Sequence, residues 1–294
     1  MTYFRTLFST ALLITFTFSC AQTDQEVKIE INKLTDNVYM LVGQGGNIGL
    51  SVGEDGVFII DDQYPHMSPK IIDAIRTLSN KPIKFLANTH HHGDHSGGNA
   101  NFQKEGAIIL AHDNVRNRLK EATNRDGSKN PEEALPIITF NDKMSLYING
   151  EQVLIRHIDN AHTDGDAILY FTESNVMHTG DTYFNGMYPY IDLSSGGSVD
   201  GYIEAVKSSL MLIDDETKII PGHGSVSNKK EYKAFLAMME GLREIIQAEI
   251  SKGKTEDQVV NDASLTKVYD DQGYSWRFIN SERIRKIYYN SLKK

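Results

Sequence analysis

Cysteine is nearly absent from this chain of 294 residues, which contains only Cys20. A single cysteine excludes an intrachain disulfide, and it leaves no thiolate to bind a metal after position 20. Clusters of Lys and Arg are also lacking. In total, 30 basic residues stand against 39 acidic ones, and the formal net charge is −9. This balance argues against nucleic acid as a partner, because a polyanion is bound by clustered cations.

Internal repeats are absent too, as no segment recurs with a period of roughly 20 to 50 residues. No low-complexity linker divides the chain. Its composition, 40% hydrophobic and 23% charged, is that of a sequence able to bury a core. We therefore expect one domain over residues 27–294.

Long apolar runs are limited to Leu7–Phe18, which follows Arg5. This run is short for a membrane span and has the form of a secretory signal. The segment TFSCA resembles the lipobox of bacterial lipoproteins, although Thr17 stands where leucine is usual. It predicts a signal peptide over residues 1–19, with Cys20 as the lipidated N-terminus of a periplasmic, membrane-anchored protein. Simple cleavage nearby would instead leave a soluble periplasmic protein.

Strand and helix patterns alternate from Val27 onward. Residues 37–61 contain apolar strands paired through glycine-rich turns, and Ser68-Pro69 begins a helix with apolar residues on one face. The continuous apolar segment IKFLA, residues 83–87, is typical of a buried strand. This alternation predicts the α/β class.

The second half continues the pattern. Asn149-Gly150 lies between two apolar segments and predicts a hairpin. One helical face extends over residues 199–213, and a long helix is expected to begin near Ser227. Residues 121–136 are polar and indicate a surface excursion, and one or two helices are expected after Thr255.

Histidines are concentrated at one place, because four of the ten lie in the segment NTHHHGDHSGG, residues 88–98. Neutral imidazoles this close compete for hydrogen-bond partners and protonated ones repel each other, a conflict that a divalent metal removes. The segment follows the predicted strand directly, where α/β proteins commonly place their sites. Later loops add His162, Asp181 and His223. Nitrogen and oxygen ligands suit zinc, and also manganese or iron.

The segment HHHGDH, with His162, Asp181 and His223 after it, resembles the HxHxDH motif and downstream ligands of the metallo-β-lactamase superfamily of hydrolases. The resemblance extends roughly from Asn32 to Ile250. It implies an αββα sandwich, in which two mixed β-sheets are flanked by helices.

The same resemblance implies two zinc ions per chain. The ligands would be His90, His92 and His162 for the first ion, and Asp94, His95 and His223 for the second. Asp181 would bridge the two ions, with the alternative that it orients a histidine from outside the ligand set. Two such ions, roughly 3.5 to 4 Å apart, lower the pKa of a shared water to roughly 7. Asp94 would be catalytic, because it can orient the resulting hydroxide toward a carbonyl and later return a proton.

The neighbouring polar residues are expected to have supporting roles. His91 is predicted to be a supporting or surface residue, and His178 a core or supporting residue. Asp61 would hydrogen-bond a ligand imidazole or cap a turn. The other histidines are expected to pack without a metal: His66, His112 and His157.

The substrate, a small molecule, is less clearly indicated. Residues 180–210 resemble the equivalent segment of di-zinc β-lactamases, and a periplasmic location favours a β-lactam. However, Asp181 replaces their cysteine, and Phe184 stands where they often carry a lysine that grips the substrate. Tyr183 and Tyr188 could bind a developing oxyanion, as in a lactonase or thioesterase. A non-catalytic zinc-binding lipoprotein is the alternative from another class. The sequence indicates no oligomeric state.

Overall fold

The computed structural model describes residues 27–123 and 127–293. The predicted signal peptide and Cys20 lie outside these residues. Within the described part, no helix combines the length and the apolar character needed to cross a membrane.

The first of two sheets is built from the N-terminal half of the chain. Strands β1 to β4 are antiparallel neighbours, and β4 to β7 continue the sheet as parallel neighbours. In order across the sheet the strands are β1 (Glu30–Lys33), β2 (Val38–Val42), β3 (Ile48–Gly53), β4 (Gly56–Ile60), β5 (Ile83–Ala87), β6 (Ile108–His112) and β7 (Ile138–Phe140). Because β4, β5 and β6 are parallel, the loops that follow them lie at one edge.

The second sheet follows in sequence and is also mixed, since only β11 and β12 pair in parallel. Its order is β13 (Ser227–Asn228), β12 (Lys218–Ile220), β11 (Val176–His178), β10 (Asp166–Phe171), β9 (Glu151–Ile158) and β8 (Lys143–Ile148). The predicted hairpin is confirmed: Asn149 and Gly150 join β8 to β9 with φ of 53° and 80°. Two positive φ angles are what a two-residue type I′ turn requires.

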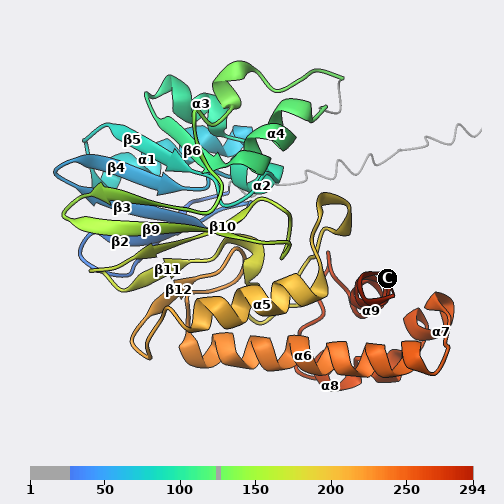
Figure 1. Cartoon of the computed structure of the whole chain (residues 1–294). Helices are drawn as coiled ribbons and strands as arrows, with labels where there is room; N and C mark the ends of the chain where they lie inside the picture. Colours follow the sequence, from blue (N-terminus) through green and yellow to red (C-terminus); the bar gives the residue numbers. More distant parts are fainter. Residues whose placement is uncertain (1–26, 124–126, 294) are drawn as a thin grey trace, which may run out of the picture.

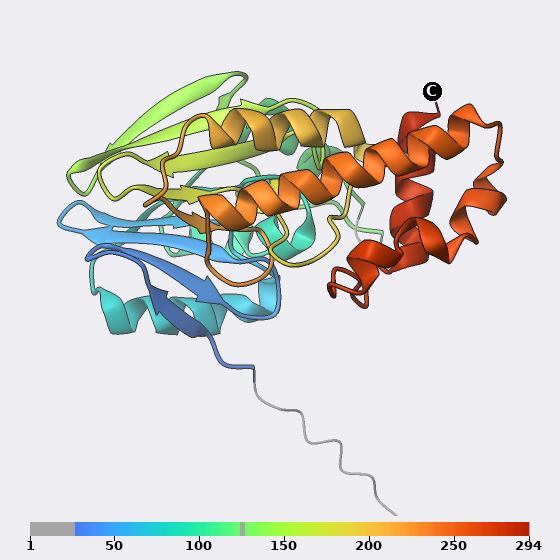
Figure 2. The ribbon, with the colours of Figure 1, turned by 90° about the horizontal axis from the view of Figure 1, so that it is seen from below.

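Helices cover the outer faces of both sheets, which confirms the predicted αββα sandwich (Figure 1). Helices α1 and α3 lie against the first sheet, and α5 and α6 lie against the second. Figure 2 shows the long α6 running beside α5 and the C-terminal helices gathered at its far end. The helices are α1 (Ser68–Leu78), α2 (Gly93–Ser96), α3 (Asn99–Lys104), α4 (Asp113–Glu121), α5 (Val199–Leu210), α6 (Lys229–Ser251), α7 (Glu256–Val260), α8 (Lys267–Asp270) and α9 (Ser281–Leu292).

Three apolar layers hold the sandwich together. The central layer joins the inner faces of the two sheets, where Phe58 of β4 meets Phe171 of β10 with ring centroids 6.1 Å apart. A second apolar layer lies between α1 and the first sheet. The third and largest layer lies between the second sheet and helices α5, α6 and α9. Full burial of each large apolar side chain contributes about 1.5–3 kcal/mol, so these layers fix how the sheets face each other.

One predicted helix boundary needs correction, and the predicted start of the long helix near Ser227 is met within two residues. Helix α5 ends at Leu210 rather than near residue 213, since Met211 caps it and the chain turns toward β12. Helix α6 begins at Lys229, because the Asn228 side chain accepts a hydrogen bond from the backbone N–H of Glu231 and forms an N-cap. After residue 255 the described chain contains three α-helices and one 3-10 helix, more than the one or two expected.

Candidate metal centre

Four loops at one edge of the sandwich deliver all seven predicted ligands. Each loop follows a strand end: β5 leads into His90, His92 and α2, and β9 leads into the loop with His162. Asp181 lies on a 3-10 helix after β11, and His223 follows β12. The residues come from both sheets, so the site exists only where the two sheets meet.

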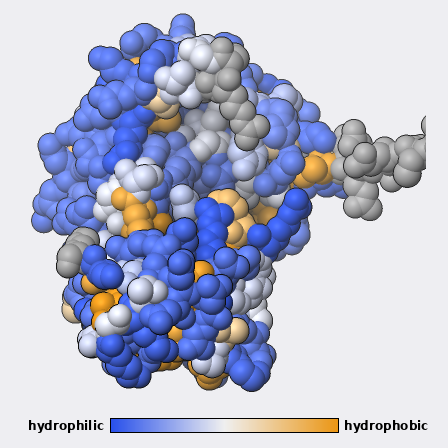
Figure 3. Space-filling view, turned by 90° about the vertical axis from the view of Figure 1, so that its right-hand side faces the viewer, coloured by the Kyte–Doolittle hydropathy of each residue, from blue (hydrophilic) through white to orange (hydrophobic). Residues whose placement is uncertain are grey.

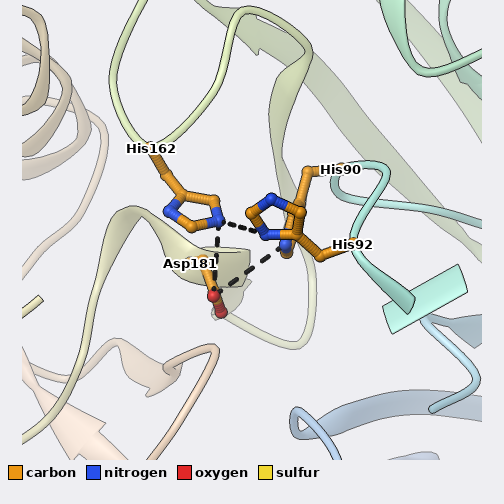
Figure 4. Close-up of side chains that lie close together, drawn as sticks. All are labelled: His90, His92, His162 and Asp181. Atoms are coloured by element: carbon orange, nitrogen blue, oxygen red, sulfur yellow. Dashed lines mark hydrogen bonds and ion pairs between the residues drawn. The ribbon is translucent and has the colours of Figure 1, made fainter. Parts of the chain in front are cut away.

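One group of donors consists of His90, His92, His162 and Asp181, whose nearest ligand atoms all lie within 4.8 Å of one another. Figure 4 shows the four side chains pointing toward a common centre. His162 Nε2 lies 2.9 Å from His92 Nδ1 and 3.5 Å from Asp181 Oδ2. The three imidazole rings stand nearly perpendicular to one another, at 83–89°. Perpendicular rings direct their lone pairs to one point rather than stacking.

A second group consists of Asp94, His95 and His223. His223 Nε2 lies 3.4 Å from both Asp94 Oδ2 and His95 Nε2. Asp181 stands between the groups, because its Oδ1 lies 3.1 Å from His95 Nε2 while its Oδ2 faces the first group. The seven predicted ligands are thus gathered at one place, with one carboxylate directed at both sets.

Burial keeps two imidazoles of the first group neutral. It lowers the pKa of His162 to about 4, against the opposing effect of Asp181, and places the pKa of His90 well below its usual range. A neutral imidazole offers a lone pair to a metal without first losing a proton.

The second group has the opposite electrostatics. Burial disfavours the charged form of His223, but Asp181 and Asp94 outweigh it and raise the pKa to about 9. Burial is likewise outweighed at His95, where the carboxylates of Asp181, Asp94 and Asp61 raise the pKa. Burial also disfavours ionised Asp94, yet the two histidines lower its pKa to about 2. In the metal-free protein, the protonated imidazoles of His95 and His223 therefore offset the charge of these carboxylates.

Hydrogen bonds behind the ligands fix their orientation. His95 Nδ1 lies 2.7 Å from Asp61 Oδ2, and Asp61 Oδ1 accepts a bond from the backbone N–H of Thr89. His162 Nδ1 lies 2.8 Å from the carbonyl oxygen of Tyr190. In both histidines Nδ1 is the donor, which leaves the Nε2 lone pair for a metal. Asp61 itself takes a left-handed φ of 64°, an uncommon conformation that places its carboxylate under the site.

Asp192 was not identified from the sequence, although it contacts a predicted ligand. Its Oδ2 lies 3.1 Å from His92 Nε2, so that Nδ1 of the same ring faces the other donors. Its Oδ1 accepts bonds from the backbone N–H groups of Ser194 and Ser195. Burial opposes ionisation of Asp192, but the hydrogen bond from His92, followed by those from Ser194 and Ser195, holds its pKa well below the usual range. The Asp-x-Ser spacing signals a cap, whereas nothing in the sequence connects it to residue 92.

Two glycines leave room for the ligands. A Cβ atom built on Gly46 would lie 2.1 Å from the His95 ring, and one on Gly222 would lie 2.1 Å from Asp181 Oδ1. Real Cβ atoms do not approach other atoms so closely, so any larger residue would displace the ligand. The glycine-rich turn after β2 is therefore part of the site.

A cavity of about 520 Å³ opens over both donor groups, a size suited to a small molecule. Half of its lining residues are aromatic: Tyr64, Phe184, Tyr190, Trp276 and Phe278. No Lys or Arg lines it in the part of the chain that the structure describes. Figure 3 shows hydrophobic surface gathered along the recess between the upper and lower parts of this face.

The three predicted substrate contacts divide between two environments. Phe184 lines the cavity, with its ring stacked on His223 at 5.0 Å. Tyr183 and Tyr188 are fully buried outside the cavity lining. The Tyr183 hydroxyl pairs with Ser227, and the Tyr188 hydroxyl donates to Asp270. These positions do not support the predicted contact of the two tyrosines with a substrate, because both hydroxyls are paired with other groups of the protein.

The remaining histidines lie outside the two donor groups, although the ring of His91 lies 4.6 Å from that of His92. His178 is buried and accepts a hydrogen bond from the backbone N–H of Gly180, which steadies the 3-10 helix carrying Asp181. His112 and His157 stack on each other at 3.7 Å, away from the site. His91 is half-buried, with Nε2 3.5 Å from Ser195 Oγ.

The family model for the metallo-β-lactamase superfamily matches residues 41–223. The chain therefore belongs to the metallo-β-lactamase superfamily and is a hydrolase with a His/Asp group that can hold metal. The resemblance in the HxHxDH motif is thereby confirmed.

Individual relatives extend this comparison. The hydroxyacylglutathione hydrolase of Pelagibacter ubique is 29% identical over 203 residues, which make up 67% of this chain and 70% of that protein. The metallo-β-lactamase of Pontibacter korlensis superposes with a TM-score of 0.63 at 15% identity, over 72% of this chain and 99% of the other. A sec-alkylsulfatase from a Pseudomonas species gives 0.66 at 16% identity, over 89% of this chain and 50% of the other. At these identities the two structures show the fold alone.

Proposed function

We propose that the chain is a zinc-dependent hydrolase that uses two metal ions to cleave an ester or thioester. The observation that carries the proposal is the position of Asp181, with one oxygen toward each donor group. One buried atom of the first group supports the fit of a metal: His90 Nε2 has no hydrogen-bond partner. Burying such a polar atom without a partner costs free energy, and a metal ion would provide what it lacks.

The donor chemistry fits zinc, because the groups offer imidazole nitrogen and carboxylate oxygen in a compact arrangement. His90, His92 and His162 would hold one ion, and Asp94, His95 and His223 the other, with Asp181 shared. When bound, two divalent ions lower the pKa of a water held between them and polarise a carbonyl oxygen.

We assign to Asp94 the role of orienting the attacking water and accepting its proton. It is the more exposed of the two carboxylates, at 25% against 5% for Asp181, and it lines the cavity. A carboxylate in this position accepts a hydrogen bond from the attacking water and orients it toward the substrate carbonyl. Its low pKa keeps it ionised at neutral pH, so it can accept a hydrogen bond from that water.

The substrate preference rests on the cavity wall. Phe184 presents a ring where a lysine would bind the carboxylate of a β-lactam, and no Lys or Arg among the described residues lines the cavity. The hydroxyacylglutathione hydrolase relative is named for an acylglutathione, in which the acyl group is held by a thioester bond. We therefore place esters and thioesters before the β-lactam that the sequence favoured. A β-lactam remains the second candidate, supported by the resemblance of residues 180–210 to the lactamase segment.

A hydrolysis panel of the zinc-loaded mature protein tests this order. It contains an acyl thioester, an aryl ester, a lactone, a β-lactam and a secondary alkyl sulfate. We expect turnover of the thioester or aryl ester to exceed that of the β-lactam. Preference for the β-lactam would reverse the order, and zinc binding without turnover of any member would favour the non-catalytic zinc-binding protein.

The role of Asp94 is tested in the same assay. Asp94→Asn should lower kcat by at least ~10²-fold, since general base assistance contributes about that much. Asp36→Asn, at a carboxylate fully exposed in the β1–β2 connection, is the matched control and should retain wild-type kcat. An Asp94→Asn enzyme with unchanged kcat would contradict the assignment.

We also propose export with a lipid anchor on Cys20. The support is the N-terminal sequence alone. Labelling cells with a radioactive fatty acid should mark the wild-type protein but not Cys20→Ser, and label in both would refute the anchor.

A further inference from the structure

The C-terminal segment supplies a wall of the cavity that lies beyond the residues matched by the family model. Trp276 and Phe278 stand in the stretch between α8 and α9, and both line the cavity together with Tyr190. Ring centroids lie 5.7 Å apart for Trp276 and Phe278, and 5.3 Å apart for Phe278 and Tyr190. These are contact distances for aromatic pairs, so the three rings form one continuous surface.

This aromatic wall adjoins both donor groups. Trp276 lies 6.4 Å from the ring of His223, at the second group. Tyr190 stacks on His92 at 5.9 Å, at the first group. A substrate whose carbonyl lies between the donor groups would therefore have its acyl side chain or its leaving group against these rings.

The wall is held in place by groups that do not themselves line the cavity. The Trp276 indole N–H donates to the carbonyl oxygen of Tyr188 at 2.9 Å. The guanidinium of Arg283 lies 4.2 Å from the centroid of Phe278 and 5.2 Å from that of Tyr190, and it donates to the Phe278 carbonyl oxygen. Such cation–π contacts restrict the rings to one orientation.

One ring of the wall is unusually accessible. Phe278 is 47% exposed, although a phenylalanine is usually withdrawn from water. Its packing partners hold it at the mouth of the cavity rather than in the core. When a ligand covers an exposed ring beside a small-molecule cavity, apolar surface is removed from water, which favours binding.

We propose that Trp276, Phe278 and Tyr190 form a specificity-determining subsite for a substrate with an aromatic acyl group beside the scissile carbonyl. The inference rests on the proposed hydrolysis and adds the class of acyl group. The rings provide apolar area and edge or face contacts for a planar group.

Paired substrates test the proposal in the zinc-loaded enzyme. The ratio of kcat/KM for a phenylacetyl thioester to that for an acetyl thioester of the same thiol should be well above one in the wild type. Phe278→Ala should lower this ratio about tenfold, since an aromatic contact is removed. Val268→Ala is the control, because Val268 is 55% exposed on the nearby α8 and does not line the cavity. It should keep the wild-type ratio.

Binding can be measured without turnover, because Trp276 is the only tryptophan in the chain. Phenylacetate should change the tryptophan fluorescence of the wild type at concentrations where acetate does not. In Phe278→Ala the same change should require about tenfold more phenylacetate. This measurement also shows whether the variant retains a folded site.

The outcomes separate the two proposals. Equal kcat/KM for both thioesters, or equal fluorescence responses to phenylacetate and acetate, would overturn the aromatic subsite while leaving the hydrolase intact. Hydrolysis of neither thioester, with phenylacetate still perturbing Trp276, would contradict the proposed thioester activity and support the subsite.

Discussion

Substitution of Asp192 by asparagine should weaken zinc binding without disturbing the fold. The variant keeps the side-chain size and an oxygen that can accept the cap bonds from Ser194 and Ser195. However, the amide N–H₂ group can now face His92 Nε2, which is itself a donor in the orientation that leaves Nδ1 free for metal. The ring must then tilt or change tautomer, and either change spoils the first donor group.

The magnitude can be taken from the usual contribution of such partners. Loss of a carboxylate behind a metal-bound histidine costs about 10–100-fold in metal affinity. At about 1.4 kcal/mol for each factor of ten, this is about 1.4–2.8 kcal/mol. The lower part of the range applies if asparagine rotates and presents its oxygen to His92 instead.

The chain contains a matched control. Asp262 caps a 3-10 helix with φ and ψ of −87° and 88°, and its carboxylate accepts a hydrogen bond from the backbone N–H of Ser264. Asp192 caps its 3-10 helix in the same Asp-x-Ser arrangement, with φ and ψ of −84° and 87°. Asp262→Asn should therefore reproduce any effect on capping but none on metal. Affinity is measured by competition of the metal-free protein with a chromophoric zinc chelator. Equal affinities for Asp192→Asn, Asp262→Asn and the wild type would refute the role of Asp192.

Three further outcomes are expected. Gly46→Ala should abolish binding of the second zinc ion, measured by metal content after dialysis, because its Cβ would overlap the His95 ring; a full complement of two ions would contradict this. Binding of that ion should release at least one proton at pH 7, since the pKa of about 9 leaves His223 protonated below pH 9. Calorimetry in buffers of different ionisation enthalpy should show this release, with affinity rising as the pH rises from 6 to 8, and equal heats would refute it. Arg285→Ala should lower the free energy of unfolding by about 2–4 kcal/mol, because the buried guanidinium donates to the carbonyl oxygen of Val260. Denaturation curves measure this change, and a decrease of less than ~1 kcal/mol would contradict the prediction.

Much of the donor set was predictable because its residues occupy a distinctive local pattern. The crowding of histidines in residues 88–98 is chemically unusual on its own, and the segment follows an apolar strand that the structure confirms as β5. The same applies to the Asn149-Gly150 hairpin, whose two residues tolerate positive φ. In such cases a few neighbouring residues determine the structure.

The parts that were missed depend on contacts between distant segments. Asp192 contacts a histidine 100 positions earlier, and no local pattern carries that information. Tyr183 is next to a cavity residue in sequence, yet its side chain points into the core toward Tyr232, as neighbouring side chains in extended backbone often diverge. Trp276 and Phe278 reach the cavity only through the course of the C-terminal helices, which periodicity does not reveal.

The distribution of the second donor group over the fold has a mechanical consequence. His95 follows a strand of one sheet and His223 follows a strand of the other, with their Nε2 atoms 3.4 Å apart. An ion held by both would clamp the two sheets at their shared edge, as a covalent crosslink does in proteins rich in cystine. Thermal unfolding should then begin at this seam when a chelator strips the ion away, in a chain whose lone cysteine rules out the covalent alternative.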